Sequence, residues 1–461
     1  MPTSVTITAS APGSRGRLLS ILGVGFGLAV AIGNTIAAGI VRTPGEIASR
    51  LPSVGLFLGV WVIGGLYALL GANALAELGT LIPRCGGQYV FARRALGPYA
   101  GFIVGWSDWI STCGTTSTVA VVIGEYMEAL FPALAGGKLA IACLVTILFA
   151  LLQWRGLRWG SRTQEVTSLL KTLLFLALVV ACFTLGGKGG AGSAVAPPVA
   201  TSLPLFLGIM VSLQAVIYTY DGWSAPIYFS EEVRDPARQL PRSLLGGVFS
   251  IMAIYLLLNA AVLYLLPLGQ VAGNNFALGV AAQKIFGASG DSIIRAVMVV
   301  SMLSGINAYH LMATRVVFAM SRDGLFSRRA VQVNEGGTPT AALFASAMVA
   351  VLLILLGNTF QKLMAAMAFF FVANYTVSFV AVFVLRRREP QAPRGYRAWG
   401  QPWTTGLALA GSVAFLLGAI VGDLTGGAGW LQRSSIHALL LLAASYPVYR
   451  IISRFAEPSS S

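Results

Sequence analysis

The sequence has little charge, few cysteines and almost no histidine. Asp, Glu, Lys and Arg make up 10% of its 461 residues, against roughly 25% in an ordinary soluble domain, and the mean hydropathy is +0.78. This composition excludes a water-soluble enzyme, a secreted disulfide scaffold and a nucleic-acid-binding protein. The cysteines lie far apart, mostly in apolar stretches, so neither a disulfide framework nor a metal site is predicted. They are Cys85, Cys113, Cys143 and Cys182.

Hydrophobic residues, in contrast, make up 56% of the chain. A transmembrane helix uses about 20 apolar residues to cross about 30 Å of hydrocarbon, so the chain can supply about twelve spans. Helices are expected because lipid satisfies no backbone polar group. The apolar segments are residues 18–44, 54–81, 99–130, 138–154, 164–186, 203–230, 243–268, 292–320, 339–357, 363–385, 403–424 and 434–455.

The basic residues indicate the topology. With twelve spans, 21 of the 31 Lys and Arg residues fall on the side of the termini, 7 on the opposite side and 3 within spans. The positive-inside rule therefore predicts a multi-pass cell-membrane protein with both termini cytoplasmic, and it explains the net charge of +15 without nucleic acid. Residues 1–17 are expected to be a flexible cytoplasmic tail. No cleavable signal peptide is predicted, because the apolar segment from Leu18 is too long and further spans follow.

Two spans are interrupted by small and polar residues. The first contains Gly-Asn-Thr-Ile-Ala-Ala-Gly-Ile at 33–40, and the sixth contains Thr-Tyr-Asp-Gly-Trp-Ser-Ala-Pro at 219–226. These spans occupy equivalent places in two successive sets of five, a pattern that points to the substrate site of a transporter. The alternative is that the glycines only allow close helix packing.

Several motifs in order along the chain support a family assignment. They are Ile36-Ala37-Ala38-Gly39-Ile40, Ala76-Glu77-Leu78-Gly79 with Pro83, Cys85-Gly86-Gly87 with Tyr89, Gln164 with Thr167 and Lys171, Tyr218-Thr219-Tyr220-Asp221-Gly222-Trp223, Glu231-Glu232-Val233, Asp235-Pro236, Pro241-Arg242, Gly305 with Asn307, Arg315, Arg322-Asp323-Gly324, and Tyr396-Arg397 with Trp399-Gly400. From Leu18 to about Trp403, the chain resembles the amino acid–polyamine–organocation superfamily, and within it the L-type amino acid transporter-like permeases. The family's Ile-Gly-Ser-Gly-Ile signature has Ala at two positions here, 37 and 38.

The resemblance implies an all-α polytopic membrane protein with twelve transmembrane helices in a LeuT-like arrangement. Residues 18–186 would form a first five-helix repeat and residues 203–385 a second, inverted one. Helices 1 and 6 would be broken, and residues 403–455 would add two further helices.

The two breaks are the predicted substrate site. A broken helix offers free N–H groups at one half-helix end and free carbonyls at the other. The substrate carboxylate is expected at the backbone N–H groups of Ile36, Ala37, Ala38 and Gly39. The ammonium is expected at carbonyls of the second break, which holds Tyr218, Asp221 and Gly222. By the resemblance Tyr218 would also be an aromatic gate, the alternative being an ordinary core or interface aromatic.

Lys171 is costly in lipid, so a function is expected for it. By the resemblance, its ammonium would take the place of a sodium ion and touch the first break. It could do so permanently, which is favoured, or it could serve proton coupling. The remaining alternative is that the side chain snorkels to the cytoplasmic face.

The roles of the acidic residues within the spans have more than one interpretation. Asp108 could carry a coupling proton, or it could face a watery cytoplasmic vestibule, which is favoured. Asp221 could point inward and favour cationic substrates, or point outward and cap freed backbone N–H groups, which is favoured. Glu77 is expected in a structural ion pair or gate, and Arg315 with Asp323 likewise. The two histidines, His310 and His437, are interpreted as structural.

The predicted function is secondary active transport of L-α-amino acids, neutral ones first, by sodium-independent alternating-access exchange. The alternatives are a proton-coupled symporter and a cationic amino acid or polyamine exchanger. No enzyme is expected, because no nucleophile–base pair or metal ligands lie at one depth, and no cofactor motif occurs. The predicted partners are small-molecule amino acids and the lipid bilayer. By the resemblance a heavy-chain subunit would attach through a cysteine near residues 131–137; none is present there, so none is expected.

Overall fold

The computed structural model describes residues 18–37, 39–186, 205–356, 360–425 and 434–455. The predicted tail at 1–17 and Ala38 of the predicted site lie outside these residues. Throughout the described part the secondary structure is helical, apart from two isolated bridges, Leu22 with Val233 and Val333 with Pro339.

The α-helices alternate with short connections and a few 3-10 turns. They are α1 (Val24–Thr35), α2 (Gly39–Ala48), α3 (Val54–Leu81), α4 (Gln88–Leu96), α5 (Pro98–Leu130), α6 (Lys138–Trp154), α7 (Leu157–Leu185), α8 (Leu205–Tyr220), α9 (Pro236–Leu265), α10 (Leu268–Val271), α11 (Ala277–Phe286), α12 (Gly290–Arg322), α13 (Thr340–Leu356), α14 (Phe360–Arg388), α15 (Trp403–Thr425) and α16 (Ser434–Phe455). The 3-10 turns are η1 (Pro132–Leu134), η2 (Ala225–Phe229), η3 (Gly287–Ser289) and η4 (Arg328–Val331).

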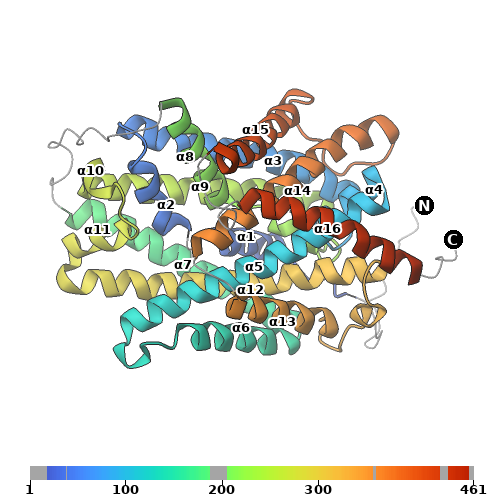
Figure 1. Cartoon of the computed structure of the whole chain (residues 1–461), viewed down its shortest axis with the longest axis horizontal. Coiled ribbons are helices and arrows are strands. Elements are labelled where there is room, and N and C mark those ends of the chain that lie inside the picture. Colours follow the sequence, from blue (N-terminus) through green and yellow to red (C-terminus); the bar gives the residue numbers. More distant parts are fainter. Residues whose placement is uncertain (1–17, 38, 187–204, 357–359, 426–433, 456–461) are drawn as a thin grey trace, which may run out of the picture.

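The helices make this an all-helical, multi-pass membrane protein. Eight helices of the described part are long and apolar enough to cross a membrane, and the bent pair α1 and α2 raises the number to nine if it forms one span. Two shorter apolar helices, α6 and α13, have 17 residues each. The long helices run side by side (Figure 1).

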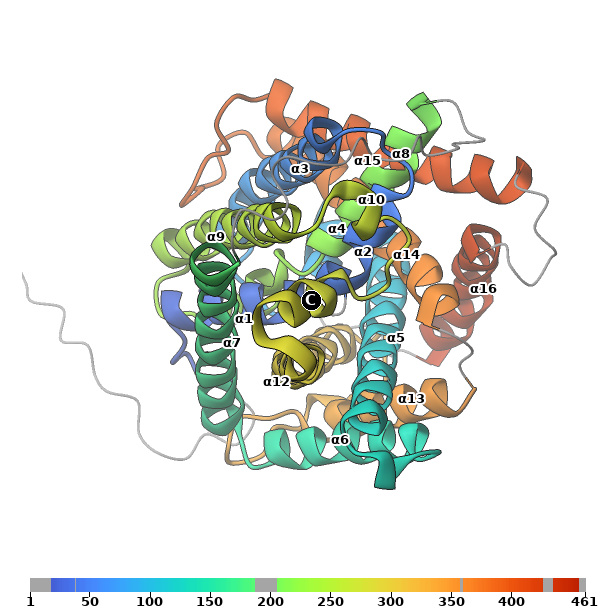
Figure 2. The same ribbon diagram turned by 90° about the vertical axis from the view of Figure 1, so that its left-hand side faces the viewer.

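The interrupted helix lies inside the bundle. Figure 2 looks along the long helices and shows α1 and α2 surrounded by α3, α9, α7, α12, α5 and α14, with α15 and α16 at the outer edge. α1 packs against α7, α9 and α12, and α2 packs against α8. The helix with the broken backbone is therefore shielded from lipid by its neighbours.

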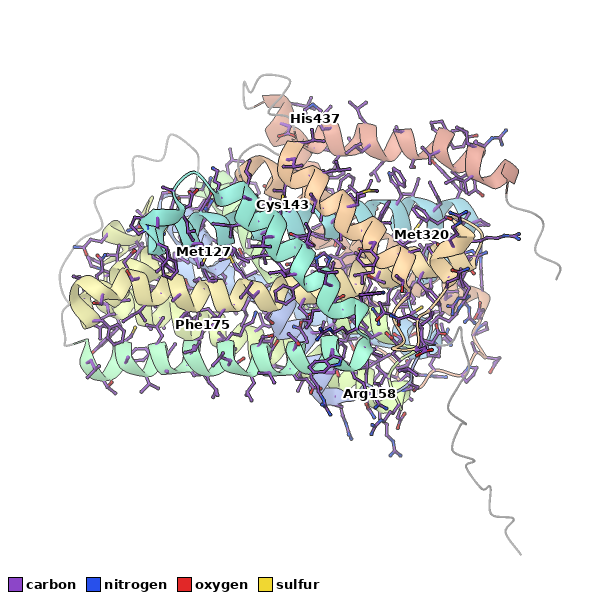
Figure 3. The ribbon with its side chains drawn as sticks, turned by 90° about the horizontal axis from the view of Figure 1, so that it is seen from below. Met127, Cys143, Arg158, Phe175, Met320 and His437 are labelled. Carbon is purple, nitrogen blue, oxygen red and sulfur yellow. The ribbon has the colours of Figure 1, made fainter. Side chains whose placement is uncertain are left out.

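α7 shows how the sequence orients a polar side chain inward. Its exposed face carries Val166, Leu169, Leu173 and Val180. Its buried face carries Gln164, Ser168, Lys171 and Phe175. Residues three or four apart share one side of a helix, so the apolar face turns to lipid while the polar face turns to α1. Figure 3 labels Phe175 along this helix and Arg158 at its beginning.

The two breaks pack directly against each other. α1 ends at Thr35 and α2 begins at Gly39 with a bend of 48°, while α8 ends at Tyr220 and leads through a turn into η2. Gly222 in that turn has φ +110°, and a Cβ there would lie 2.9 Å from the carbonyl carbon of Asn34. The Asn34 side-chain amide donates a hydrogen bond of 3.4 Å to the Gly222 carbonyl. Glycine thus allows the two irregular segments to cross at the centre of the molecule.

Candidate functional site

A small cavity lies where the two breaks cross. Its walls come from both breaks and from α5, α12 and α14. The lining residues are Asn34, Thr35, Ala37, Gly39, Thr115, Thr118, Val119, Tyr218, Thr219, Asp221, Tyr309 and Phe371.

The end of α1 is held by a buried ammonium group. Lys171 is 0% exposed, and its Nζ donates to the carbonyls of Ile36 (2.8 Å), Gly33 (3.0 Å) and, more weakly, Ile32 (3.5 Å). Carbonyls at a helix C-terminus have no intrahelical partner and carry the negative end of the helix dipole. Because the side chain is buried against α1, the alternative of snorkelling to the surface is wrong.

Three hydroxyl groups hold the remaining carbonyls of this break. Ser301 of α12 donates to the Ile36 carbonyl (2.8 Å), and Tyr309 of α12 donates to the Asn34 carbonyl (3.0 Å). Tyr255 of α9 lies 2.8 Å from the Thr35 carbonyl and 3.0 Å from the Thr219 carbonyl. The carbonyl side of the first break is therefore occupied by the protein itself.

The other end of the first break faces the cavity. α2 begins at Gly39, and both Ala37 and Gly39 line the cavity. The first N–H groups of a helix have no intrahelical acceptor and form a natural anion site. Ile36 is fully buried and contributes its carbonyl to Lys171 rather than a surface to the cavity.

In the second break, Tyr218 and Asp221 line the cavity and Gly222 packs on the first break. The Tyr218 carbonyl accepts the Asp221 backbone N–H (3.0 Å). The Asp221 carboxylate accepts the hydroxyl of Tyr375 (2.6 Å) and the backbone N–H of Gly222. Asp221 therefore caps its local turn, the role favoured from the sequence, and the residue is also part of the cavity lining.

Asp108 does not face a vestibule in this conformation. It is 1% exposed, and the Tyr228 hydroxyl lies 2.8 Å from Oδ1 and 2.9 Å from Oδ2. In this conformation the Tyr228 side chain of η2 lies against the Asp108 carboxyl group where the favoured interpretation placed water.

The ion pairs near the helix ends confirm the prediction for Glu77 and correct the one for Arg315. Glu77 pairs with Arg386 (2.5 Å) and Arg394 (3.1 Å), which confirms the predicted structural ion pair. Arg315 pairs with Glu232 (2.9 Å) and not with Asp323. Eight residues of helix separate Arg315 from Asp323 by about 12 Å, which is why the predicted pair does not form.

Asp323 belongs instead to a cluster at the end of α12. It pairs with Arg84 (3.3 Å) and Arg93, and it accepts the hydroxyl of Tyr89 (2.9 Å). Beside it, Glu231 accepts the Cys85 N–H (3.1 Å) and pairs with Arg322 (2.9 Å).

Glu231 lies outside the spans and is ionised. Burial raises its pKa, but the Cys85 N–H and the Arg322 guanidinium outweigh burial and hold the pKa below its ordinary value. The ion pair with Arg322 therefore persists at neutral pH. Figure 3 shows the many side chains gathered near Met320, at this end of α12.

The predicted structural role of His310 is confirmed by its surroundings. It is 1% exposed, and its Nε2 lies 3.1 Å from the Thr146 carbonyl. Among the described residues no group of three or more His, Cys, Asp or Glu side chains is placed to bind a metal.

Sequence reasoning missed the hydroxyl groups of α5. Thr115 and Thr118 line the cavity, and the signal was the run Ser-Thr-Cys-Gly-Thr-Thr-Ser-Thr at 111–118, unusual within an apolar helix. Two further polar atoms, Asn34 Oδ1 and Thr35 Oγ, are buried without a hydrogen-bond partner among the described residues. Both side chains line the cavity, where a ligand can satisfy them.

The fold and cavity define a multi-pass membrane protein with a small-molecule cavity between two interrupted helices. The chain belongs to the amino acid permease family, whose sequence model matches residues 18–444. This places it in the superfamily that the sequence motifs indicated.

Characterised relatives are transporters of amino acids. The chain is 28% identical to the serine/threonine exchanger SteT of Bacillus subtilis, over 93% of this chain and 95% of the relative. It is 27% identical to the large neutral amino acids transporter small subunit 2 of Mus musculus, over 85% of this chain and 75% of the relative. Identity to the Asc-type amino acid transporter 1 of Mus musculus is also 27%, over 79% of this chain and 70% of the relative.

Proposed function

We propose that the chain is a secondary transporter that exchanges neutral L-α-amino acids across the cell membrane by alternating access, without sodium. The observation that carries this proposal is the cavity at the crossing of two interrupted helices, next to the beginning of α2. The functions of the relatives, exchange of serine and threonine and transport of large neutral amino acids, agree with it.

The substrate's two charged groups would meet opposite ends of the cavity. The α-carboxylate would accept from backbone N–H groups at Ala38 and Gly39, where small side chains allow close approach. The N–H groups of Ile36 and Ala37 already donate within the protein, to the carbonyls of Ile32 and Thr35 (3.0 Å each). The ammonium would donate to acceptors of the second break near Tyr218 and Asp221. Tyr218 would close over the bound substrate as a gate.

Lys171 would replace a coupling ion. Its ammonium already occupies the carbonyl end of α1, the kind of place at which half-helix ends coordinate a sodium ion in transporters with broken helices. A covalently attached cation needs no ion from solution, so transport would proceed without sodium. The alternative of proton coupling through Lys171 requires the ammonium to leave these carbonyls as it loses a proton.

The finer architecture is part of the proposal. Residues 18–186 and 203–385 would form two inverted five-helix repeats of the LeuT-like kind, with 403–455 as two appended helices and twelve spans in all. Each proposed repeat begins with an interrupted helix, α1 with α2 and α8 with η2. Both termini would be cytoplasmic, and the chain would act without a heavy-chain subunit.

A second candidate is exchange of cationic amino acids, because a carboxylate lines the cavity. Asp221 already accepts two hydrogen bonds, from Tyr375 and Gly222. An ionised carboxylate has about four acceptor positions, which leaves room for a guanidinium or ammonium group of a substrate side chain.

Uptake of radiolabelled L-serine and, in parallel, of radiolabelled L-arginine into proteoliposomes, each with a panel of competing amino acids, separates the two candidates. Neutral L-amino acids are expected to compete, and L-arginine and L-lysine to compete weakly. Replacement of Asp221 by Asn should leave competition by neutral amino acids within about fivefold of wild type, since the lost hydrogen bonds are worth about 1 kcal/mol. Competition by L-arginine and L-lysine alone, lost in Asp221→Asn, would overturn the neutral proposal. No uptake of any amino acid would overturn both candidates.

A further inference from the structure

Asp108 is a buried acid to which the exchange proposed above assigns no role. It lies on α5 with both carboxyl oxygens next to one hydroxyl group, that of Tyr228, at 2.8 and 2.9 Å. One O–H group makes one good hydrogen bond at a time, so Tyr228 cannot satisfy both oxygens together. Tyr228 is itself buried, at 2% exposed.

No cation compensates a charge on Asp108. Among the described residues, the ionisable groups that act on it are Tyr228 of η2 and Asp221 of the preceding turn, and neither is basic. The helices packed against α5, namely α4, α6, α12, α13, α14 and α16, contribute no ionisable group that acts on this carboxyl. An uncompensated carboxylate inside a membrane protein is strongly disfavoured.

A second observation points to a proton as the missing ligand. Thr112 is four residues after Asp108 on the same face of α5, and its side chain acts on the Asp108 carboxyl. Thr112 is 1% exposed, and its Oγ has no partner with hydrogen-bond geometry among the described residues. This hydroxyl, which can donate or accept, therefore lies unpartnered among the described residues next to an acid that has no cation.

We propose that Asp108, Tyr228 and Thr112 form a reversible proton-binding site, which is filled in the conformation described here. In the protonated state the Asp108 O–H donates to Thr112 Oγ, while the Tyr228 O–H donates to the other carboxyl oxygen. On release, the O–H bond of the acid breaks, the proton passes to water, and both hydroxyl groups turn to donate to the carboxylate. The two hydroxyl groups can serve both states because each can be donor or acceptor.

The proton-binding site adjoins the interrupted span, so its access to water should change when that span moves during transport. Tyr228 lies on η2, which continues the span whose break carries Tyr218 and Asp221 in the cavity wall. The Tyr228 ring packs so closely against Gly87 that it would clash with a Cβ at that position. The backbone carbonyl of Tyr228 accepts a hydrogen bond from the Gly86 N–H (3.4 Å). Since Asp108 is covered in this conformation, its proton can exchange with water only when η2 moves away from α5.

Infrared difference spectroscopy of the purified full chain tests proton binding without any substrate. Acidification from about pH 9 to about pH 5 should produce a carboxylic-acid carbonyl band that is absent in Asp108→Asn. Tyr228→Phe should keep this band and move it to higher frequency, because the carbonyl oxygen loses its donor. Asp235→Asn is the matched control, since Asn caps the exposed start of α9 as well as Asp does, and it should behave as wild type. An Asp108→Asn spectrum identical to wild type would overturn the proposal.

Exchange of L-serine between preloaded proteoliposomes and medium tests the link to transport, and this second readout rests on the proposed function. The wild-type rate should fall about tenfold per pH unit once the site is mostly ionised, and Asp108→Asn should vary less than about twofold over the same range. An unchanged pH dependence in Asp108→Asn would overturn the link, and so would wild-type exchange that requires sodium. Absence of all amino acid exchange would instead contradict the proposed function, while the infrared experiment would still decide whether the proton site exists.

Discussion

Lys171 is a charged side chain that is 0% exposed within a long apolar helix. A lysine inside a span is expensive unless its ammonium finds acceptors, and here the acceptors are backbone carbonyls that the end of α1 leaves free. The lysine and the helix break thus depend on each other: the break supplies the acceptors, and the lysine makes their burial tolerable. This mutual dependence is the reason to expect a mechanistic role.

Replacement of Lys171 by Met, which keeps the length of the side chain, should abolish exchange. The Gly33 carbonyl would lose its donor, which costs about 1–3 kcal/mol for a buried group left unpaired, while the Ile36 carbonyl keeps the hydrogen bond from Ser301 (2.8 Å) and the rest of the bundle remains packed. The measurements are L-serine exchange in proteoliposomes and the size-exclusion profile and thermal unfolding of the purified protein.

Lys284→Met is the control for this variant. The Lys284 ammonium also donates to a carbonyl, that of Leu265 (3.0 Å), but from an exposed residue that does not line the cavity. It should keep near-wild-type exchange. Full activity of Lys171→Met would remove the residue from the mechanism.

At the residue scale, the sequence predicts which side chains matter better than it predicts their partners. Lys171 and Asp221 stand out because charge is rare in the spans, and the structure brings both to the helix breaks. The partners of Asp108 and Arg315 could not be foreseen. Tyr228 and Glu232 lie more than eighty residues away from them in sequence, and only the folded chain brings the segment after the second break next to Asp108 of α5 and Arg315 of α12.

At the scale of elements, the two breaks form one unit. Gly222 sits against the backbone of Asn34 and Thr35 with a positive φ, so a side chain there meets both steric and conformational resistance. The positions of the breaks were predictable, because runs of small and polar residues interrupt otherwise apolar spans. The contribution of α5 was not, because its hydroxyl groups could equally have bonded to their own helix backbone, as Thr115 and Thr118 in fact also do.

Gly222→Ala should lower both stability and exchange. The positive φ alone costs about 1 kcal/mol, and the contact with the Asn34 backbone adds about 1–3 kcal/mol of overpacking. Gly97 offers a matched control: its φ is +99°, but no atom lies within 4 Å of a Cβ built there. Thermal unfolding in detergent should show a clearly larger loss for Gly222→Ala than for Gly97→Ala. Equal losses would mean that the crossing of the breaks is not tightly packed.

At the scale of the whole molecule, the few charged residues and the many apolar ones lie on different parts of the protein. Apolar side chains such as Leu169 and Leu173 cover the outside of the long helices, while ion pairs such as Glu77 with Arg386 lie near one end. The asymmetry of Lys and Arg along the chain predicts that this end is cytoplasmic. The sequence carries this information because charge placement follows the membrane, whereas helix-to-helix contacts depend on shapes that a sequence pattern does not contain.

Single-cysteine labelling tests that orientation. In a chain whose four native cysteines are replaced by Ala or Ser, Lys138→Cys at the start of α6 should react with a membrane-impermeant maleimide on intact cells. Arg238→Cys at the start of α9 should react only after the membrane is opened, and both positions are exposed in the folded chain. The reverse pattern would invert the proposed topology.

Counterflow in sodium-free proteoliposomes tests the central claim, sodium-independent exchange, most directly. Vesicles that contain the protein are preloaded with unlabelled L-serine or left empty, and uptake of trace radiolabelled L-serine is followed in both. The account predicts strong uptake into preloaded vesicles, little uptake into empty ones, and no change when sodium is added. Equal uptake into empty and preloaded vesicles, or uptake that appears only with sodium, would contradict it.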